Sequence, residues 1–222
     1  MTTATSNATR EIMRILIADD HVIVRSGLRR ILELEFPDVV IGETATCEEL
    51  VRKAKSTAWD VVILDVALGA ENGLNALPAL KDACPRLPVI VLSMYGERQF
   101  VVRALAAGAS AYLTKEQAAD EELFRAIRTV CAGRRYLGEA LAEQLADHLG
   151  KDSGGQPHEA LSTRELEVFL FLAAAKSVSE IAERLHLSAK TVSTYRTRIL
   201  EKMSLASNAE IIQYAVRNGL VG

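Results

Sequence analysis

The first 133 residues alternate short β-branched runs with amphipathic helical patterns, and this alternation limits the fold more than any other feature. The runs at 13–18, 39–43, 61–64, 89–92 and 111–113 read as strands. Helical spacing of apolar residues follows at 22–35, 48–56, 74–83, 98–107 and 121–132. Continuous apolar runs such as VVIL are typical of strands buried on both faces. The (βα)5 order predicts a flavodoxin-like, doubly wound parallel sheet with helices on both faces.

The C-terminal part contains no strand-like run. Four helices are predicted over 161–175, 178–185, 189–203 and 208–218. Either Ser162 or Thr163 could cap the first helix, and Ser162 has Glu165 three residues on as a capping-box partner. Ser177 or Ser179 can cap the second helix, and Ser188 can cap the third. The fold class is therefore α/β followed by an all-α, four-helix domain, with a further helical pattern at 138–149 between the two parts.

A polar, glycine-containing stretch at 150–157 marks the break between the two domains. We expect a first domain over 12–133, a partly helical linker over 134–157 and a second domain over 158–222. The formal net charge of -3 hides an asymmetry. Divided at Gly155, the first part has 18 basic and 22 acidic residues, net -4, and the second has 8 and 7, net +1. The acidity therefore belongs to the first domain.

Neither a membrane span nor an export signal is expected. No apolar run approaches the roughly 20 residues that a membrane helix needs, and the polar start lacks the apolar stretch of a signal peptide. The three cysteines form no CxxC pair, so neither a disulfide framework nor a thiolate zinc site is suggested. We expect a cytoplasmic protein that does not bind membranes.

Charged and hydroxylated residues fall repeatedly at the predicted strand ends. Ligands bind beyond the carboxyl ends of the strands in open parallel sheets. Four strand ends carry such residues: Asp19 and Asp20, then Asp65, Ser93 and Lys115. Clustered carboxylates repel one another unless a cation lies among them, and oxygen ligands suit Mg2+. The sequence thus predicts a magnesium site at this edge of the sheet.

Phosphoryl transfer is the chemistry that this set of residues favours. A bound metal would bring a phosphoryl donor to one carboxylate, while Lys115 and the Ser93 hydroxyl would bind the remaining oxygens. The carboxylate could then act as a nucleophile and form an aspartyl phosphate. His21, beside the acidic pair, could pass for a metal ligand, but we favour it as the start of the following helix.

The second domain has the spacing of a helix-turn-helix, with a short helix at 178–185, a turn at 186–188 and a longer helix at 189–203. Four basic residues against Glu201 give the longer helix a local charge of +3. Cations supply affinity for phosphates, and side chains near the start of such a helix reach base edges in the major groove. The overall charge of -3 therefore does not exclude DNA binding.

The motifs of the first domain resemble the receiver domain of two-component response regulators: IADDH at 17–21, VVILDVALGAENG at 61–73, VLSM at 91–94 and AYLTK at 111–115. The resemblance implies that Asp65 accepts phosphate from a sensor histidine kinase. It also implies that Asp19, Asp20, Asp65 and the main-chain carbonyl of Ala67 hold Mg2+, that Ser93 and Lys115 contact the phosphoryl group, and that Tyr112 changes rotamer on activation.

This sequence departs from the receiver pattern just after Asp65. The family commonly has Met-Pro where Leu68 and Gly69 stand here. Leu68 keeps the packing, whereas Gly69 is expected to make the loop more flexible. Phosphorylation of Asp65 should still occur, but the lifetime of the phosphorylated state should differ.

The second domain resembles the LuxR-type helix-turn-helix through LSTRELEV at 161–168 and SEIAERLHLSAKTVSTYRTRILEKM at 179–203. With a receiver in front, the whole chain resembles a response regulator of the NarL/FixJ type. The resemblance implies that Ser193, Thr194 and Thr197 face bases. It implies phosphate contacts for the remaining polar positions, namely Lys190, Thr191, Arg196, Arg198 and Lys202. Double-stranded promoter DNA, a sensor histidine kinase and a second copy of the chain after phosphorylation are the expected partners, with RNA polymerase a further candidate.

Two other functions share parts of this pattern. A metal-dependent phosphotransfer enzyme would use the same aspartyl phosphate, but Ala67 stands two residues after Asp65, where such an enzyme needs a general acid. A small-ligand receptor fused to the DNA-binding module is disfavoured because the pocket offers carboxylates, a hydroxyl and an amine. We therefore expect a phosphorylation-controlled, DNA-binding transcription regulator that is not an enzyme.

Overall fold

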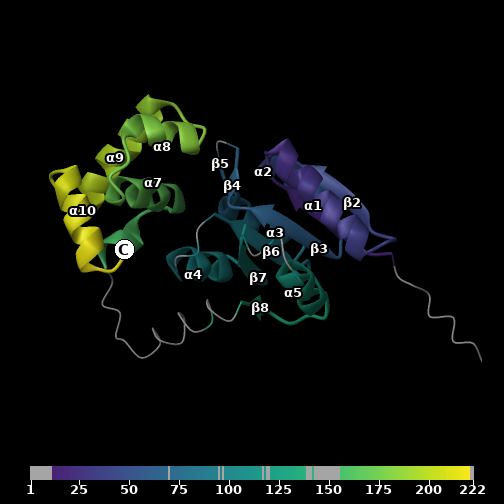
Figure 1. Cartoon of the computed structure of the whole chain (residues 1–222). Coiled ribbons are helices and arrows are strands. Elements are labelled where there is room, and N and C mark those ends of the chain that lie inside the picture. The colour runs from purple at the N-terminus through teal and green to yellow at the C-terminus, as the bar shows by residue number, and fades with distance from the viewer. Residues whose placement is uncertain are drawn as a thin grey trace, which may run out of the picture.

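The chain forms an α/β lobe followed by a helical lobe (Figure 1). The computed structural model describes residues 12–69, 71–94, 96, 98–116, 118, 121–138, 142 and 156–220. Apart from residues 138 and 142, the helix expected over 138–149 lies outside this described part of the chain.

A parallel sheet forms the centre of the first lobe, in the strand order β2-β1-β3-β6-β7-β8. Five of these strands match the predicted ones to within one residue at each end: β1 (Arg14–Ala18), β2 (Val40–Thr44), β3 (Val61–Asp65), β6 (Val89–Ser93) and β7 (Ala111–Thr114). The sixth, β8 (Tyr136–Leu137), pairs with β7 at the edge and was not predicted. The doubly wound parallel sheet that the sequence predicts is confirmed.

Helices cover both faces of this sheet (Figure 1). They are α1 (Val22–Glu35), α2 (Cys47–Ser56), α3 (Ala76–Ala83), α4 (Arg98–Ala106) and α5 (Glu121–Cys131). Side chains along β1 alternate between the faces. Ile15 and Ile17 pack with Leu32 of α1 and Ile127 of α5, whereas Leu16 lies in the other core, under α2, α3 and α4. Burial on both faces explains why the strands are apolar throughout.

The loop after Asp65 folds into a small antiparallel ribbon of β4 (Ala67–Leu68) and β5 (Glu71–Asn72), before a 3-10 turn, η1 (Gly73–Asn75), leads into α3. Gly69 in the turn of this ribbon has a φ of 64°. A proline ring holds φ near -65°, so proline cannot adopt this conformation. Glycine in place of the family's proline therefore gives the loop a path that proline would forbid.

The second lobe consists of α7 (Thr163–Ala173), α8 (Val178–Arg184), α9 (Ala189–Met203) and α10 (Asn208–Arg217), preceded by the 3-10 turn η3 (Pro157–Ala160). Ser162 and Ser177 begin α7 and α8 with capping boxes, and Ser188 accepts a hydrogen bond from the backbone of Thr191 at the start of α9. The predicted caps are confirmed, with Ser177 rather than Ser179 starting α8. Val192 and Ile199 of α9 are fully buried in the core of this lobe.

The two lobes touch each other. Buried apolar side chains of both lobes belong to one continuous cluster, and the Arg103 guanidinium of α4 donates to the main-chain oxygen of Glu159 at 3.1 Å. Within the described part of the chain, none of the helices is both long and apolar enough to span a membrane.

Candidate functional site

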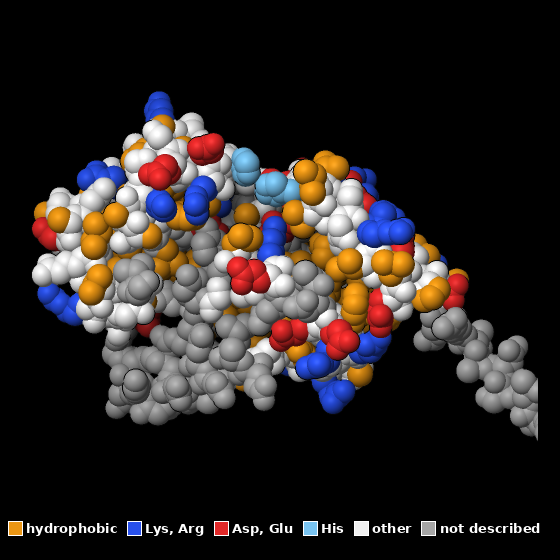
Figure 2. All heavy atoms as spheres, in the orientation of Figure 1, with side chains coloured by type: hydrophobic (Ala, Val, Ile, Leu, Met, Phe, Trp, Pro, Cys, Tyr) orange, Lys and Arg blue, Asp and Glu red, His pale blue; other side chains and the backbone are white. Residues whose placement is uncertain are grey.

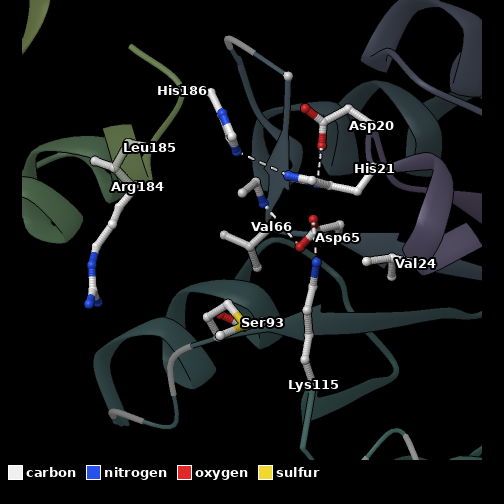
Figure 3. Close-up of a pocket in the computed structure, with 13 residues that line it drawn as sticks. Asp20, His21, Val24, Asp65, Val66, Ser93, Lys115, Arg184, Leu185 and His186 are labelled. Carbon is white, nitrogen blue, oxygen red and sulfur yellow. Dashed lines mark hydrogen bonds and ion pairs between the residues drawn. The ribbon is translucent and has the colours of Figure 1, made fainter. Parts of the chain in front are cut away.

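The strand ends bring together the side chains that the sequence analysis singled out. Asp19 and Asp20 follow β1, Asp65 is the last residue of β3, and Ser93 is the last residue of β6. Lys115 follows β7, and its backbone N–H donates to the Ser93 carbonyl at 2.7 Å. Parallel register thus places residues from four strands in one pocket (Figure 3).

Lys115 joins the two most deeply buried carboxylates. Its Nζ lies 2.7 Å from Asp65 Oδ2 and 3.0 Å from Asp19 Oδ2. Only 2% of Asp65 and 1% of Asp19 are exposed. Burial and the Asp19 charge, opposed by Lys115, raise the pKa of Asp65 to about 7. Burial lowers the pKa of Lys115, but the two carboxylates outweigh it and raise that pKa overall.

The oxygen atoms of the pocket suit a divalent cation. Ligand atoms of Asp19, Asp20, His21 and Asp65 all lie within 4.8 Å of one another. The buried Asp20 Oδ1 lies 2.8 Å from His21 Nδ1, but this contact does not have the geometry of a hydrogen bond. Within the described residues this oxygen has no hydrogen-bond partner. Three carboxylates face a single ammonium group, so their summed charge is negative. An uncompensated buried oxygen and this excess charge are features that a bound cation would satisfy.

Backbone and side-chain bonds hold these carboxylates in place. The Arg25 guanidinium of α1 donates to the main-chain oxygen of Asp19 at 2.6 Å and also to Glu43 of β2. The backbone N–H of Ala67 donates to Asp65 Oδ1 at 3.2 Å, which keeps the Ala67 main chain beside the phosphoacceptor candidate. The sequence analysis did not assign Arg25, because no local pattern links residue 25 to the loop at 19.

Tyr112 and Ser93 differ from the other site residues because both side chains are completely buried. Tyr112 lies on β7 in the core under α2, α3 and α4. Ser93 lines the pocket. The Tyr112 side chain therefore points into the core of the receiver.

The helix-turn-helix itself closes one side of the pocket. A cavity of about 250 Å³ lies between the lobes. Arg184 at the end of α8, with Leu185 and His186 from the turn after it, lines this cavity together with the strand-end residues. His21 Nε2 lies 3.2 Å from His186 Nε2 across this boundary (Figure 3). Sequence reasoning missed these three residues because their place depends on how two separate domains dock, for which the sequence has no local signal.

The outer face of α9 stays accessible despite this docking. Exposed side chains include those of Lys190, Ser193, Thr194, Thr197 and Arg198. The hydroxyls of Ser193 and Thr194 donate back to main-chain oxygens four residues earlier, at 2.9 and 3.0 Å, which leaves their lone pairs as acceptors. Thr197 does the same at 3.2 Å. The docked turn therefore does not bury the predicted base-facing side chains.

Three of the predicted phosphate contacts have side-chain partners inside the domain, and one of them, Thr191, shares a hydrogen bond with the Ser188 hydroxyl at 2.8 Å. Lys202 Nζ lies 2.6 Å from Glu165 Oε2 of α7, and the Arg196 Nε donates to Asn208 Oδ1 of α10 at 2.6 Å. Both pairs tie α9 to its neighbours. Lys190 and Arg198 have no ion pair or side-chain hydrogen bond within the described residues, which leaves their charges available.

Comparisons with known proteins agree with this two-part architecture. Residues 15–128 match the response regulator receiver domain, and residues 159–215 match the luxR family of bacterial regulatory proteins. The response regulator GacA of Pseudomonas protegens is 39% identical over 209 residues, which cover 94% of this chain and 98% of GacA. The response regulator UvrY of Escherichia coli is 35% identical, covering 94% and 95%.

The chain also aligns with solved structures of response regulators. RcsB of Salmonella typhimurium aligns with a TM-score of 0.56 at 25% identity, over 92% of this chain and 98% of RcsB. A LuxR-family two-component response regulator from Aurantimonas aligns with a TM-score of 0.58 at 31% identity, over 63% of this chain and 99% of that one. An RcsB–DNA complex also matches, with a TM-score of 0.55.

The fold and the pocket define a receiver domain joined to a helix-turn-helix, which is the class of DNA-binding transcription regulators controlled by phosphorylation. Two family models match this chain, and relatives more than 30% identical align with nearly all of it. These matches show which family within that class the chain belongs to. The chain belongs to the NarL/FixJ-type response regulators with a LuxR-type DNA-binding domain.

Proposed function

We propose that Asp65 is the phosphoacceptor through which a sensor histidine kinase controls promoter binding by α9. The observation that carries this proposal is the position of Asp65 at the bottom of a pocket whose other wall is the helix-turn-helix. A chemical change at Asp65 therefore occurs directly beneath the DNA-binding domain.

The pocket residues take separate parts in the transfer. A carboxylate oxygen of Asp65 attacks phosphorus, and the bond from phosphorus to the donor nitrogen breaks as the new bond forms. The Lys115 ammonium group, 2.7 Å from Asp65 Oδ2, can move to bind a phosphoryl oxygen. The Ser93 hydroxyl can donate a hydrogen bond to another phosphoryl oxygen. Tyr112 is proposed to respond to this movement because it stands three residues before Lys115 on the same strand end.

Mg2+ is the cofactor that this donor set fits, with the carboxylates of Asp19, Asp20 and Asp65 and the carbonyl of Ala67 as the proposed ligands. When bound, it supplies charge neutralisation between carboxylates and phosphoryl oxygens. The unsatisfied Asp20 Oδ1 supports this assignment. In the Mg2+-bound chain the Asp65 carboxyl is expected to be ionised, since a nearby cation favours the charged form.

Phosphorylation is proposed to act by weakening the docking of the two lobes. The acyl phosphate carries about two negative charges in place of the single charge of the Asp65 carboxylate and adds three acceptor oxygens, in a cavity of about 250 Å³ whose far wall is Leu185 and His186. In the docked arrangement the added charge faces the apolar Leu185 side chain, which disfavours docking, and the freed domain can then pair with a second copy to read two half-sites. RNA polymerase is a further proposed partner at such promoters.

The remaining assignments follow from this regulator. The receiver is proposed to span 12–133, the linker 134–157 and the DNA-binding domain 158–222. β8 places Tyr136 and Leu137 on the receiver sheet, so the first residues of the linker are fixed to the receiver. We assign the chain to the cytoplasm, where promoter DNA is found. It is not proposed as an enzyme, because Ala67 offers no acid beside Asp65 for release of the phosphoryl group.

The test compares DNA binding by wild type, Asp65→Asn and the matched control Asp82→Asn, an exposed aspartate on α3. Fragments bound from the organism's own genome are sequenced with and without a small phosphodonor and Mg2+. We expect the phosphodonor to increase binding by wild type and by Asp82→Asn but not by Asp65→Asn. Equal enrichment for all three proteins under both conditions would refute control through Asp65.

A further inference from the structure

Two histidines from different domains face each other at the mouth of the pocket. His21 is the residue before α1, and His186 lies in the turn between α8 and α9. Their Nε2 atoms are 3.2 Å apart and their ring centroids 5.2 Å apart. Figure 2 shows histidine side chains meeting at the surface in the hollow between the lobes, within reach of solvent.

The carboxylates behind His21 determine which of its nitrogens is free. His21 Nδ1 lies 2.8 Å from Asp20 Oδ1 and 3.3 Å from Asp19 Oδ1. Both carboxylate contacts of the ring are made by Nδ1, so Nε2 is the nitrogen that faces His186. Histidines that bind metals are commonly oriented in this way, by a carboxylate on the other ring nitrogen.

The distance between the two Nε2 atoms fits a shared metal ion. Zinc binds histidine nitrogen at about 2.0–2.1 Å with tetrahedral geometry, which places two such nitrogens about 3.3 Å apart. The observed separation is 3.2 Å. The Arg184 guanidinium, at the end of α8, points away from the histidine pair in Figure 3. The acidic pocket beneath the pair adds attraction for a cation.

The His186 backbone has a φ of 51°, in the left-handed region. Ala175 and Ser204 adopt the same region after α7 and α9, so this conformation belongs to the helix ends and decides which substitutions the turn accepts.

We propose that His21 Nε2 and His186 Nε2 bind one transition-metal cation of the Zn2+ class between the receiver and the helix-turn-helix. Water molecules complete the coordination. Imidazole ligands favour this class of cation, whereas the oxygen ligands below favour Mg2+, so the two sites select different ions. A ligand that binds only the docked arrangement shifts the population toward it, so the cation would hold the two lobes closed.

Zn2+ titration of the full-length, chelator-treated protein in excess Mg2+ tests this site, with calorimetry and light scattering at each step. His186→Asn removes the imidazole and suits the left-handed backbone. His148→Asn is the control, because it removes one of the chain's other imidazoles by the same substitution. We expect one Zn2+ per monomeric wild-type chain, at least about tenfold weaker binding by His186→Asn and unchanged binding by His148→Asn.

Nitrogen NMR of the wild-type histidines keeps the test decisive if a variant fails to fold. The chain has four histidines, and His158 is buried with its Nδ1 2.7 Å from the Tyr214 hydroxyl. Zn2+ should shift the Nε2 signals of His21 and His186 and leave those of His148 and His158 in place. Equal Zn2+ affinity of wild type and His186→Asn, a shift at His21 alone, or a doubling of mass on Zn2+ addition would each overturn the proposal.

Discussion

Gly73 lies so close to β3, the strand that ends in Asp65, that a single methyl group should disturb this strand. A Cβ atom built at this position would lie 2.1 Å from the main-chain oxygen of Asp65 and 3.2 Å from Leu64 Cδ1. The Gly73 N–H also donates to the Val66 carbonyl at 2.7 Å, which holds the returning loop against β3. The cost of Gly73→Ala is therefore steric and falls directly on the backbone of Asp65.

The size of the effect follows from the clash. Real Cβ atoms essentially never approach closer than 3.0 Å, so the two backbones must separate by at least about 0.9 Å. Overpacking of this kind costs about 1–3 kcal/mol of unfolding free energy. A displacement of about 1 Å at a reacting group can reduce its rate by as much as about a hundredfold. We expect phosphorylation of Gly73→Ala to be at least about tenfold slower than that of wild type.

Gly27→Ala is the matched control, because a Cβ at Gly27 meets nothing within 4 Å and the residue is exposed within α1. It should stabilise the protein by up to about 1 kcal/mol, since alanine favours helices more than glycine does. Urea denaturation measures stability, and the initial rate of phosphoryl incorporation from acetyl phosphate measures function. Wild-type stability and rate in Gly73→Ala would refute the reasoning.

Three further substitutions test the electrostatics of the two domains. Without Mg2+, the pKa of Asp65 rises from 3.8 to about 7 on folding. The folded chain therefore retains a proton that the unfolded chain loses, and stability should fall as pH rises between these values. Asp65→Asn should flatten that slope in urea denaturation, and equal slopes would contradict the assignment. In DNA binding, Arg198→Ala should lower the salt slope by about one and Lys202→Ala by less, because Glu165 already pairs with Lys202. A larger loss in Lys202→Ala would reverse this ranking.

The strand-end residues were predictable because they depend on local patterns and one rule of topology. Apolar runs located the strands, and parallel strands place their carboxyl ends at one edge of the sheet. Asp19, Asp65 and Lys115 had to meet there once the alternation of strands and helices was recognised. The distances of Lys115 Nζ from Asp65 (2.7 Å) and from Asp19 (3.0 Å) could be known only from the structure. The same holds for the Asp65 pKa of about 7, because burial and ion pairing set it.

Other features depend on contacts between distant segments, and sequence patterns do not show them. β8 has only two residues, too few for a recognisable alternation, and exists because Tyr136 and Leu137 pair with the edge of β7. Lys202 was predicted to contact phosphate from its position on a basic helix. Its side chain is 42% exposed and pairs with Glu165, which makes its contribution to DNA binding depend on breaking that pair. Helical periodicity gives the face of a residue but not its partner.

The turn at Leu185 and His186 couples access to Asp65 in the first domain to release of the second domain. Only 2% of Asp65 is exposed, and the turn at Leu185 and His186 closes one wall of its pocket. A kinase domain is much larger than a cavity of about 250 Å³, so transfer from a kinase requires the lobes to separate first. In the proposed mechanism the dimer on DNA forms from the freed helical domain, and so draws on the same separation. Phosphorylation and DNA binding therefore draw on one open arrangement, and by linkage each favours the other.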